Sequence, residues 1–267
     1  MKKKIVVKVK NLSKEFKVSQ KRIKAVNNIS FNLYKEEFVG FIGQNGAGKT
    51  TTLKCLTGLL TPDEGEVRVL GYIPQKRDYD FLERISLVMG NKSQLWWELP
   101  AMETFLLNKE IYQIEDTLFR KNLAEMVERL GISESINVPV RKLSLGERMK
   151  CELVASFLHS PELLFLDEPT LGLDVVSQQK LRDFLADYQA RNKATVILTS
   201  HNMEDIKNLC KRVIIIDKGK LLFDGRLTEL AEKFVKRNLF DLYYLFLNRR
   251  ERYQVWERYW NLMVKLD

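Results

Sequence analysis

Short apolar runs alternate with longer amphipathic stretches along most of the chain. Segments rich in β-branched residues predict strands at 5–12, 29–33 and 66–70. Mostly apolar runs of four or five residues predict buried strands at 38–42, 85–89, 163–166, 195–198 and 213–216. Helical periods fill 49–60, 102–130, 146–158, 175–190 and 203–209. Strands that alternate with helices predict an α/β fold whose largely parallel sheet is covered on both faces.

Two regions depart from this alternation and suggest how the chain is organised. The block 102–130 has long helical periods and few turn residues, so we expect a helical subdomain at about 95–160 within a main domain spanning 4–226. The tail 227–267 is helical in pattern and interleaves aromatic residues with arginines. It fits either an amphipathic helix for a partner or lipid surface or a segment that packs on its own sheet. We favour the second alternative.

Composition narrows the class of protein. No apolar run approaches the roughly 20 residues that cross a bilayer, and the apolar segment 5–7 after the basic start is too short for a signal peptide. We therefore expect a cytosolic protein. Three widely spaced cysteines without a C-x-x-C pair predict reduced thiols. The net charge of +9 fits attraction to nucleic acid or anionic lipid, and it equally fits a basic surface of mixed sign.

The clearest chemical motif is G-x-x-x-x-G-K-[ST] at residues 43–50. Glycines allow the backbone N–H groups to wrap closely around a phosphate, and the helix that begins there adds its positive dipole end. Lys49 supplies a charge for the β- and γ-phosphates, and the Thr50 hydroxyl suits Mg²⁺. The position between a predicted strand and a predicted helix favours this reading over a plain glycine turn. We expect nucleotide contacts from Gly43, Gln44, Asn45, Gly46, Ala47, Gly48, Lys49, Thr50 and Thr51.

Two adjacent carboxylates follow the apolar run 163–166. Ligands of α/β folds bind at the carboxyl ends of the strands, which is where this pair is predicted to lie. Asp167 suits coordination of Mg²⁺, and Glu168 suits polarisation of the water that attacks the γ-phosphate. An apolar strand followed by acidic residues is common by itself, but the phosphate-binding motif upstream favours the catalytic interpretation.

A third element lies between these two motifs, at Leu143-Ser144-Leu145-Gly146-Glu147. The order of the motifs resembles the ATP-binding domain of the ABC superfamily over roughly residues 6–225, since other phosphate-loop ATPases lack an LSGGQ-type element before the acidic strand. The resemblance implies a P-loop NTPase fold of the ABC type, with an N-terminal antiparallel β subdomain and a helical subdomain. It also implies that the chain binds ATP and Mg²⁺ and hydrolyses ATP.

The resemblance assigns roles to single residues. Ser144 and Gly146 match the serine and second glycine of LSGGQ, which contact the ATP held by the opposite subunit. Leu145 and Glu147 depart from the family's glycine and glutamine, and the same segment is also an ordinary helix-capping sequence. Asp174 matches the D-loop, which communicates between the two sites of the dimer. It also fits the N-cap of the following helix.

Three further assignments come from the same resemblance. His201 matches the family's switch histidine, which acts with Lys49 and Glu168 in catalysis. Phe16 matches the aromatic that stacks on adenine, with core packing as the alternative. The family's Mg²⁺-sensing glutamine after strand 85–89 has no identical match. Asn91 takes that place as a ligand-binding and metal-contacting residue, with Gln94 as its competitor.

The segment 94–100 resembles the ABC-2 exporter group, the NatA- and daunorubicin-resistance-like branch. We expect Trp96 and Trp97 to line the dock of a coupling helix, with packing against the helical block as the alternative. The resemblance implies a homodimer, or a pair with a similar subunit, bound to a separate transmembrane permease at the inner face of the cell membrane. A non-transport ABC ATPase acting on nucleic acid or the ribosome is the less favoured alternative, because there is one cassette and no coiled-coil insert.

Overall fold

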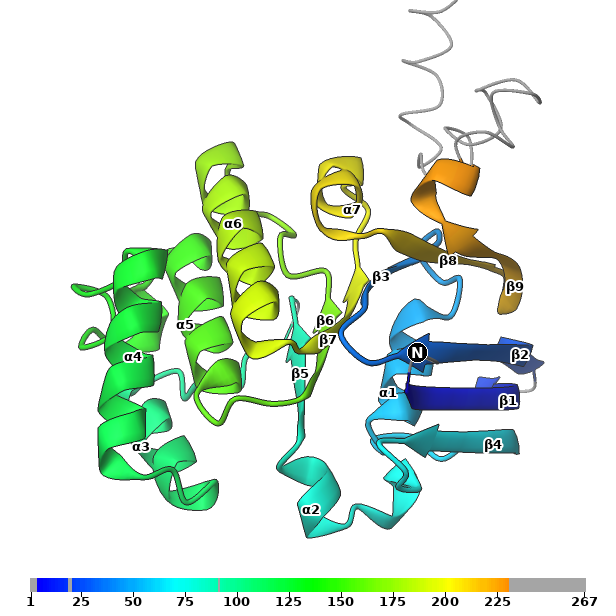
Figure 1. The fold of residues 1–267 in the computed structure, drawn as a ribbon, viewed down its shortest axis with the longest axis horizontal. Helices are drawn as coiled ribbons and strands as arrows, with labels where there is room; N and C mark the ends of the chain where they lie inside the picture. The colour runs from blue at the N-terminus through cyan, green and yellow to red at the C-terminus, as the bar shows by residue number, and fades with distance from the viewer. Residues whose placement is uncertain (1–3, 19–20, 91, 231–267) are drawn as a thin grey trace, which may run out of the picture.

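The computed structural model describes residues 4–18, 21–90 and 92–230 of the 267-residue chain. The predictions that concern Asn91 and residues 231–267 of the tail therefore lie outside the described residues. Figure 1 shows a small antiparallel sheet at one side of the molecule, helices α3 to α5 at the other, and the large sheet between them. No helix within the described part of the chain combines the length and the hydrophobicity of a membrane span.

The small sheet has the strand order β2-β1-β4 and is antiparallel throughout. Its strands are β1 (Ile5–Val18), β2 (Lys21–Tyr34) and β4 (Glu64–Val69). The first two are longer than predicted, because their paired outer halves are exposed and carry few apolar residues. Backbone pairing alone continues the ladder there, and a hydrophobic pattern does not reveal such pairing.

The large sheet has the strand order β5-β6-β7-β3-β8-β9. Its parallel strands are β3 (Phe38–Ile42), β5 (Ile85–Met89), β6 (Leu163–Asp167), β7 (Thr195–Thr199) and β8 (Arg212–Asp217). Strand β9 (Lys220–Arg226) closes the edge antiparallel to β8 and was not predicted, because only alternate residues are partly buried. The predicted α/β P-loop fold with its mainly parallel sheet is confirmed.

Most helices follow the predicted segments, and the short helix at Tyr79–Leu82 was not predicted. They are α1 (Lys49–Leu56), α2 (Tyr79–Leu82), α3 (Ala101–Ile111), α4 (Asp116–Leu130), α5 (Leu145–Phe157), α6 (Val175–Asn192) and α7 (Met203–Leu209), with 3₁₀ turns η1 (Pro74–Lys76) and η2 (Val140–Lys142). The predicted helical block 102–130 contains two helices, α3 and α4. Glu115 begins the second helix by accepting hydrogen bonds from the N–H groups of Thr117 and Leu118. A side-chain cap of this kind stabilises a new helix start.

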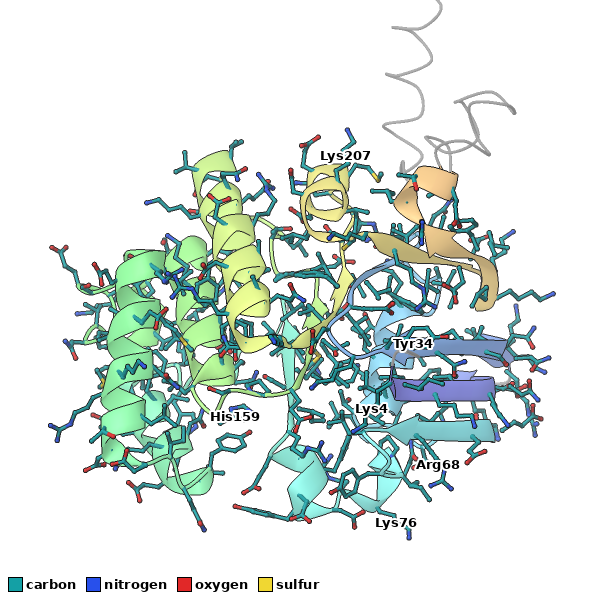
Figure 2. The ribbon with its side chains drawn as sticks, viewed as in Figure 1. Lys4, Tyr34, Arg68, Lys76, His159 and Lys207 are labelled. Carbon is teal, nitrogen blue, oxygen red and sulfur yellow. The ribbon has the colours of Figure 1, made fainter. Side chains whose placement is uncertain are left out.

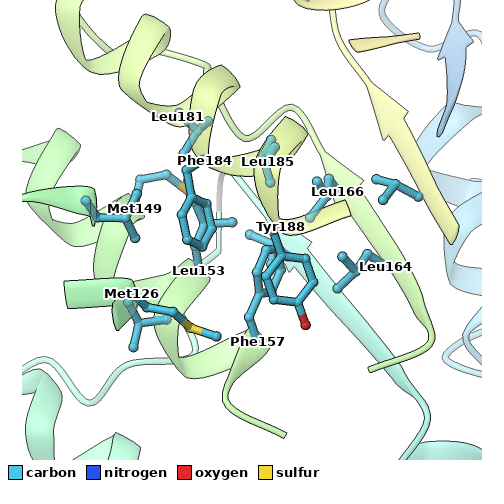
Figure 3. Close-up of a cluster of buried hydrophobic side chains, with 14 of the residues drawn as sticks. Met126, Met149, Leu153, Phe157, Leu164, Leu166, Leu181, Phe184, Leu185 and Tyr188 are labelled. Atoms are coloured by element: carbon cyan, nitrogen blue, oxygen red, sulfur yellow. The ribbon is translucent and has the colours of Figure 1, made fainter. Parts of the chain in front are cut away.

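Two hydrophobic clusters hold these layers together. One lies under helix α1, between the two sheets, and contains Phe31 and Phe41. The other joins the large sheet to helices α4, α5 and α6, and Figure 3 shows its centre. There the ring of Phe157 lies 5.8 Å from that of Phe184 and 4.6 Å from that of Tyr188. The second cluster therefore anchors the serine-bearing helix α5 to the sheet.

Charged side chains cover the surface with both signs. Figure 2 shows Arg68 and Lys207 projecting outward, and each is paired with a nearby glutamate, Glu66 and Glu204. Such exposed pairs contribute little to stability, typically about 0–1 kcal/mol. The stability of the fold therefore depends on the buried clusters rather than on these exposed ion pairs.

Replacing Phe157 by alanine tests the importance of the α5–α6 cluster. Phe157 is fully buried, so Phe157→Ala removes its ring contacts and leaves a cavity. We expect the free energy of unfolding, measured in urea, to fall by about 3–5 kcal/mol. Leu118→Ala is the control, because Leu118 is exposed on α4, and it changes stability by less than about 0.5 kcal/mol. Equal effects of the two substitutions would contradict this view of the core.

Candidate active site

The glycine loop, residues 43–48, connects the buried strand β3 to the start of α1. A Cβ atom on Gly43 would lie 2.2 Å from the carbonyl oxygen of Ile216, and one on Gly48 would lie 2.3 Å from that of Ala25. Gly48 also has a φ of 107°, which side chains rarely adopt. The two glycines are therefore required by close backbone packing against β8 and β2.

The remaining loop residues form the turn itself. The N–H group of Ala47 donates to the carbonyl oxygen of Gln44 at 3.0 Å. Asn45 and Gly46 are exposed, and a Cβ on Gly46 would meet no atom within 4 Å. Thr51 lies in the first turn of α1. The rim of the loop is thus open, and the helix that follows it presents its N–H groups there.

Lys49 is the first residue of α1, and its side chain folds back over the glycine loop. Its Nζ donates to the carbonyl oxygens of Gly43 at 2.7 Å and Gln44 at 3.1 Å, and it lies 3.7 Å from Oε1 of Glu168. Burial lowers the pKa of this ammonium, and the Glu168 and Asp167 carboxylates act in the opposite direction. The loop thus surrounds a buried cation.

Asp167 connects three elements at the carboxyl end of β6. Its Oδ2 accepts a hydrogen bond from the Thr50 hydroxyl at 2.7 Å, and its Oδ1 accepts one from the Thr199 hydroxyl at 2.6 Å. Its carbonyl oxygen accepts a bond from the N–H group of Gly90 at 2.8 Å. The Asp167 carboxylate is therefore held between the start of α1 and the end of β7, and its backbone is bonded to the residue after β5.

Glu168 follows with a φ of 55°, an uncommon conformation for a residue with a side chain. Its N–H group is shared by the carbonyl and hydroxyl oxygens of Thr199, both at 3.0 Å, and this pairing holds the turn. Its Oε1 lies 2.7 Å from Nε2 of His201. That contact lowers the pKa of the Glu168 carboxyl, although partial burial acts to raise it. Glu168 is therefore a carboxylate at neutral pH.

A buried ionic network supports the loop that carries His201. Asp205 is fully buried at the start of α7. One of its oxygens accepts from Arg182 at 2.9 Å, and the other accepts from the hydroxyls of Thr170 at 2.6 Å and Ser200 at 2.7 Å. Because every oxygen is satisfied, this network fixes the residue next to His201 and links it to helix α6.

The donor set of this group fits a phosphate ester with a divalent cation. Lys49 and the start of α1 provide positive charge for phosphate oxygens. The Thr50 hydroxyl and the Asp167 carboxylate are hard oxygen ligands, and the hydrogen bond between them shows that they face the same point. The structure therefore brings together Lys49, Thr50, Asp167, Glu168 and His201, which the sequence predicted as one site.

Ser144 and Gly146 belong to a second group of residues at the tip of α5. Ser144 caps the helix in a reciprocal capping box with Glu147, whose other oxygen accepts from the Ser135 hydroxyl at 2.6 Å. The capping interpretation of this segment is thus confirmed, and a phosphate contact is compatible with it. A Cβ on Gly146 would lie 3.3 Å from Oγ of Ser177.

The same tip meets the segment that contains Asp174. A Cβ on Gly172 would lie 2.7 Å from Cδ2 of Leu145, so the two segments are in close contact. Asp174 is the N-cap of α6 and accepts from the N–H group of Ser177 at 2.9 Å. Its predicted capping role is therefore confirmed, and its role between two sites stays a prediction.

The last predicted residues lie apart from these two groups. Phe16 is a half-exposed residue of β1, and Nζ of Lys14 lies 5.8 Å from the centre of its ring. The amide of Gln94 donates to the carbonyl oxygen of Leu87 at 2.8 Å and to the hydroxyl of Ser156 at 3.3 Å. Since Asn91 lies outside the described residues, the choice between Asn91 and Gln94 as the metal-sensing residue stays open.

Sequence reasoning missed three residues that shape the site. Thr199 and Gly90 hold Asp167, and Asp205 holds the turn next to His201. A signal for the first two exists in the strand pattern, because parallel strands place Asp167 beside Thr199 and Met89 beside Asp167. Asp205 carries no comparable signal, since its partner Arg182 lies 23 residues earlier on another helix.

Comparison with known proteins places this arrangement in a family. The model of the ABC transporter family matches residues 26–171. The ABC transporter ATP-binding protein NatA of Bacillus subtilis (strain 168) is 31% identical over 90% of this chain and 96% of its own length. The bacitracin transport ATP-binding protein BcrA of Bacillus licheniformis is 34% identical over 74% of this chain and 64% of its own. The predicted family and its NatA-like branch are confirmed.

A solved structure with the same fold is the dimeric post-hydrolysis state of the ATP-binding cassette MJ0796 bound to ADP and Pi. Its TM-score is 0.74, at 24% sequence identity, over 83% of this chain and 98% of that one. The similarity therefore covers most of this chain and nearly all of the solved one. It supports the predicted fold independently of the sequence motifs.

Two alanine substitutions in the glycine loop separate steric packing from backbone strain. Gly43→Ala forces the loop or β8 to shift, so we expect the free energy of unfolding to fall by about 1–3 kcal/mol. Gly46→Ala adds an atom to open space and costs only the strain of a φ of 79°, about 1 kcal/mol. Urea unfolding measures stability, and binding of a fluorescent ATP analogue measures the effect on the loop. A loss of stability in the Gly46 variant that exceeds the loss in the Gly43 variant would contradict this account.

Proposed function

Because the chain belongs to the ABC transporter family and is one of its ATP-hydrolysing subunits, we propose that it powers export across a membrane. In this proposal two copies close around two ATP molecules. The pair is bound to a separate membrane-spanning permease at the inner face of the cell membrane. The observation that supports it best is the convergence of five side chains: Thr50 bonds to Asp167 at 2.7 Å, His201 lies 2.7 Å from Glu168, and Nζ of Lys49 lies 3.7 Å from the same glutamate.

Each member of this group has a distinct task in the proposed reaction. Lys49 and the glycine loop bind the β- and γ-phosphates, and Thr50 and Asp167 hold Mg²⁺. The bound Mg²⁺ neutralises charge on the phosphate oxygens. Glu168 is a carboxylate that accepts a proton from, and orients, the attacking water. His201 holds that carboxylate in place and extends toward the γ-phosphate.

Closure of two copies completes the site in this proposal, since Ser144 and Gly146 approach the γ-phosphate bound by the partner subunit. Exposed apolar residues near this tip support the proposal that a second copy covers it. Leu171 is 52% exposed, Val175 78% and Val176 64%. Exposed apolar residues that cluster in this way are typical of protein–protein interfaces. Asp174 lies between them and caps α6.

The membrane partner is proposed to dock beside α3. Trp96 is 59% exposed and Trp97 51%. Trp96 lines a groove of about 340 Å³ together with Leu99, Leu106 and Leu107 and with Glu103 and Glu110. An apolar groove with acidic residues at its rim fits a short amphipathic helix that carries basic side chains. NatA and BcrA are both named as ATP-binding proteins that act in transport, which supports a membrane transporter subunit as the partner.

Glu168→Gln tests whether ATP holds two copies together. The substitution keeps the size of the side chain but removes the carboxylate that accepts the proton. We expect phosphate release to fall by about 10²-fold or more, and size-exclusion chromatography with ATP and Mg²⁺ to show a stable dimer. The control adds Lys49→Ala, which removes the phosphate contact and leaves a monomer under the same conditions. A Glu168→Gln chain that stays monomeric at saturating ATP rules out the proposed closure.

Alanine at both Trp96 and Trp97 tests the proposed dock. We expect the double variant to sediment with native membrane vesicles, stripped of peripheral proteins, at least about tenfold more weakly than the wild type, a loss of about 1.4 kcal/mol. Tyr79→Ala is the matched control, because Tyr79 is a similarly exposed aromatic residue on α2. Unfolding temperatures exclude misfolding. Equal sedimentation of all three proteins would assign the tryptophans to packing on the helical subdomain.

A further inference from the structure

One face of helix α5 contacts the loop that follows strand β5. Arg148, Glu152 and Ser156 are four residues apart and so lie on one side of the helix. The Arg148 guanidinium lies 5.4 Å from the centre of the Trp97 ring, and the Ser156 hydroxyl accepts from the Gln94 amide at 3.3 Å. Three successive turns of α5 therefore contact residues 93–97, the segment that leads to the proposed dock.

Glu152 makes the central and strongest of these contacts. Its Oε1 accepts hydrogen bonds from the Ser93 hydroxyl, from the N–H group of Gln94 at 2.8 Å and, more weakly, from the N–H group of Leu95 at 3.4 Å. The Glu152 side chain is only 3% exposed, and its second oxygen is buried without a hydrogen-bond partner among the described residues. A carboxylate is rarely buried in this way without a role, since the burial is costly.

We propose that Glu152 is a positioning residue that fixes residues 93–95 to α5, so that the two tryptophans and the tip at Ser144 move as one body. What that motion accomplishes rests on the proposed function. Glu152 lies eight residues after Ser144 on the same helix, a separation of about 12 Å along the axis. A displacement imposed at the dock is thereby transmitted to the residue proposed to contact the second ATP.

The other end of the same loop explains why such a link is needed. Gly90 donates to the carbonyl oxygen of Asp167, so the loop begins at the catalytic group. A Cβ on Gly90 would lie 2.3 Å from the carbonyl oxygen of Glu168, which shows how closely the two segments pack. The loop thus connects the γ-phosphate end of one site with the α5 tip. Without Glu152, the N–H group of Gln94 loses its acceptor, and the Ser93 hydroxyl and the Leu95 N–H group keep only the local contacts between Ser93 and Leu95. The connection to α5 therefore weakens.

The first experiment measures hydrogen–deuterium exchange of the peptide that contains residues 92–97, in the full chain. Glu152→Leu removes the acceptor, and we expect exchange in this peptide to speed up by about tenfold or more, which corresponds to a local opening that is about 1.4 kcal/mol easier. Glu152→Gln keeps one acceptor oxygen and restores most of the protection. Glu128→Ala, on the exposed face of α4, is the control and leaves this peptide unchanged.

The second experiment measures how the link affects closure. In the Glu168→Gln background, we expect Glu152→Leu to raise the ATP concentration needed for half-maximal dimerisation by about fivefold or more, with Glu152→Gln again close to the parent. Ser93→Ala, which removes only one donor, has a smaller effect and serves as the variant that keeps the fold intact.

The two readouts separate the proposal from the proposed function. Unchanged exchange in the Glu152→Leu peptide overturns the positioning role, whatever the chain hydrolyses. If Glu152→Leu raises exchange in every peptide, the residue stabilises the whole fold rather than this loop. That result also overturns the proposal. If the Glu168→Gln parent does not dimerise with ATP, the proposed function fails, while the exchange measurement still decides whether Glu152 holds the loop.

Discussion

The burial of one lysine beside two carboxylates is the constraint on which the site depends. Lys49 is 5% exposed, and the cost of desolvating its ammonium is offset only by nearby oxygens, from the glycine loop and from Glu168 and Asp167. These acceptors come from segments more than 100 residues apart. They meet because β3 and β6 are parallel strands whose carboxyl ends lie at the same edge of the sheet. The sheet order is therefore the precondition of the chemistry.

The block of helices α3 to α5 is connected to that edge of the sheet through one of its members. Its helix α5 is held to the sheet by the Phe157 cluster at its far end, while its near end carries the capping box at Ser144. Between these two ends, one face of α5 contacts the loop that follows β5 through Arg148, Glu152 and Ser156. A helix fixed at one end by apolar packing and along one side by hydrogen bonds is stiff along its axis. This stiffness suits the transmission of a displacement from a surface loop to the tip.

The sequence predicted the parallel strands and the phosphate-binding group because both leave strong local patterns. The runs 38–42 and 163–166 are apolar at nearly every position, as buried strands require, and Gly43–Thr50 combines glycines with a lysine at fixed spacing. The outer halves of β1 and β2, strand β9 and helix α2 were not predicted. The strand segments are largely exposed and show only weak alternation, and α2 is only four residues long. Asp205 and Glu152 were missed for another reason. Their importance lies in partners that are distant in sequence, and no local pattern records those partners.

The two departures from the family motif at the α5 tip have a common physical explanation. A glutamine at position 147 donates and accepts hydrogen bonds, whereas Glu147 only accepts, and here it accepts from Ser135 and Ser144, which lowers the pKa of its carboxyl. The negative charge opposes a phosphate nearby, but the N-terminal end of α5 offsets part of it. Leu145, in place of glycine, packs against Gly172 and joins the tip to the segment that leads to Asp174. The tip thus makes side-chain contacts on both sides, which is the property needed if it moves as part of one body with the docking loop.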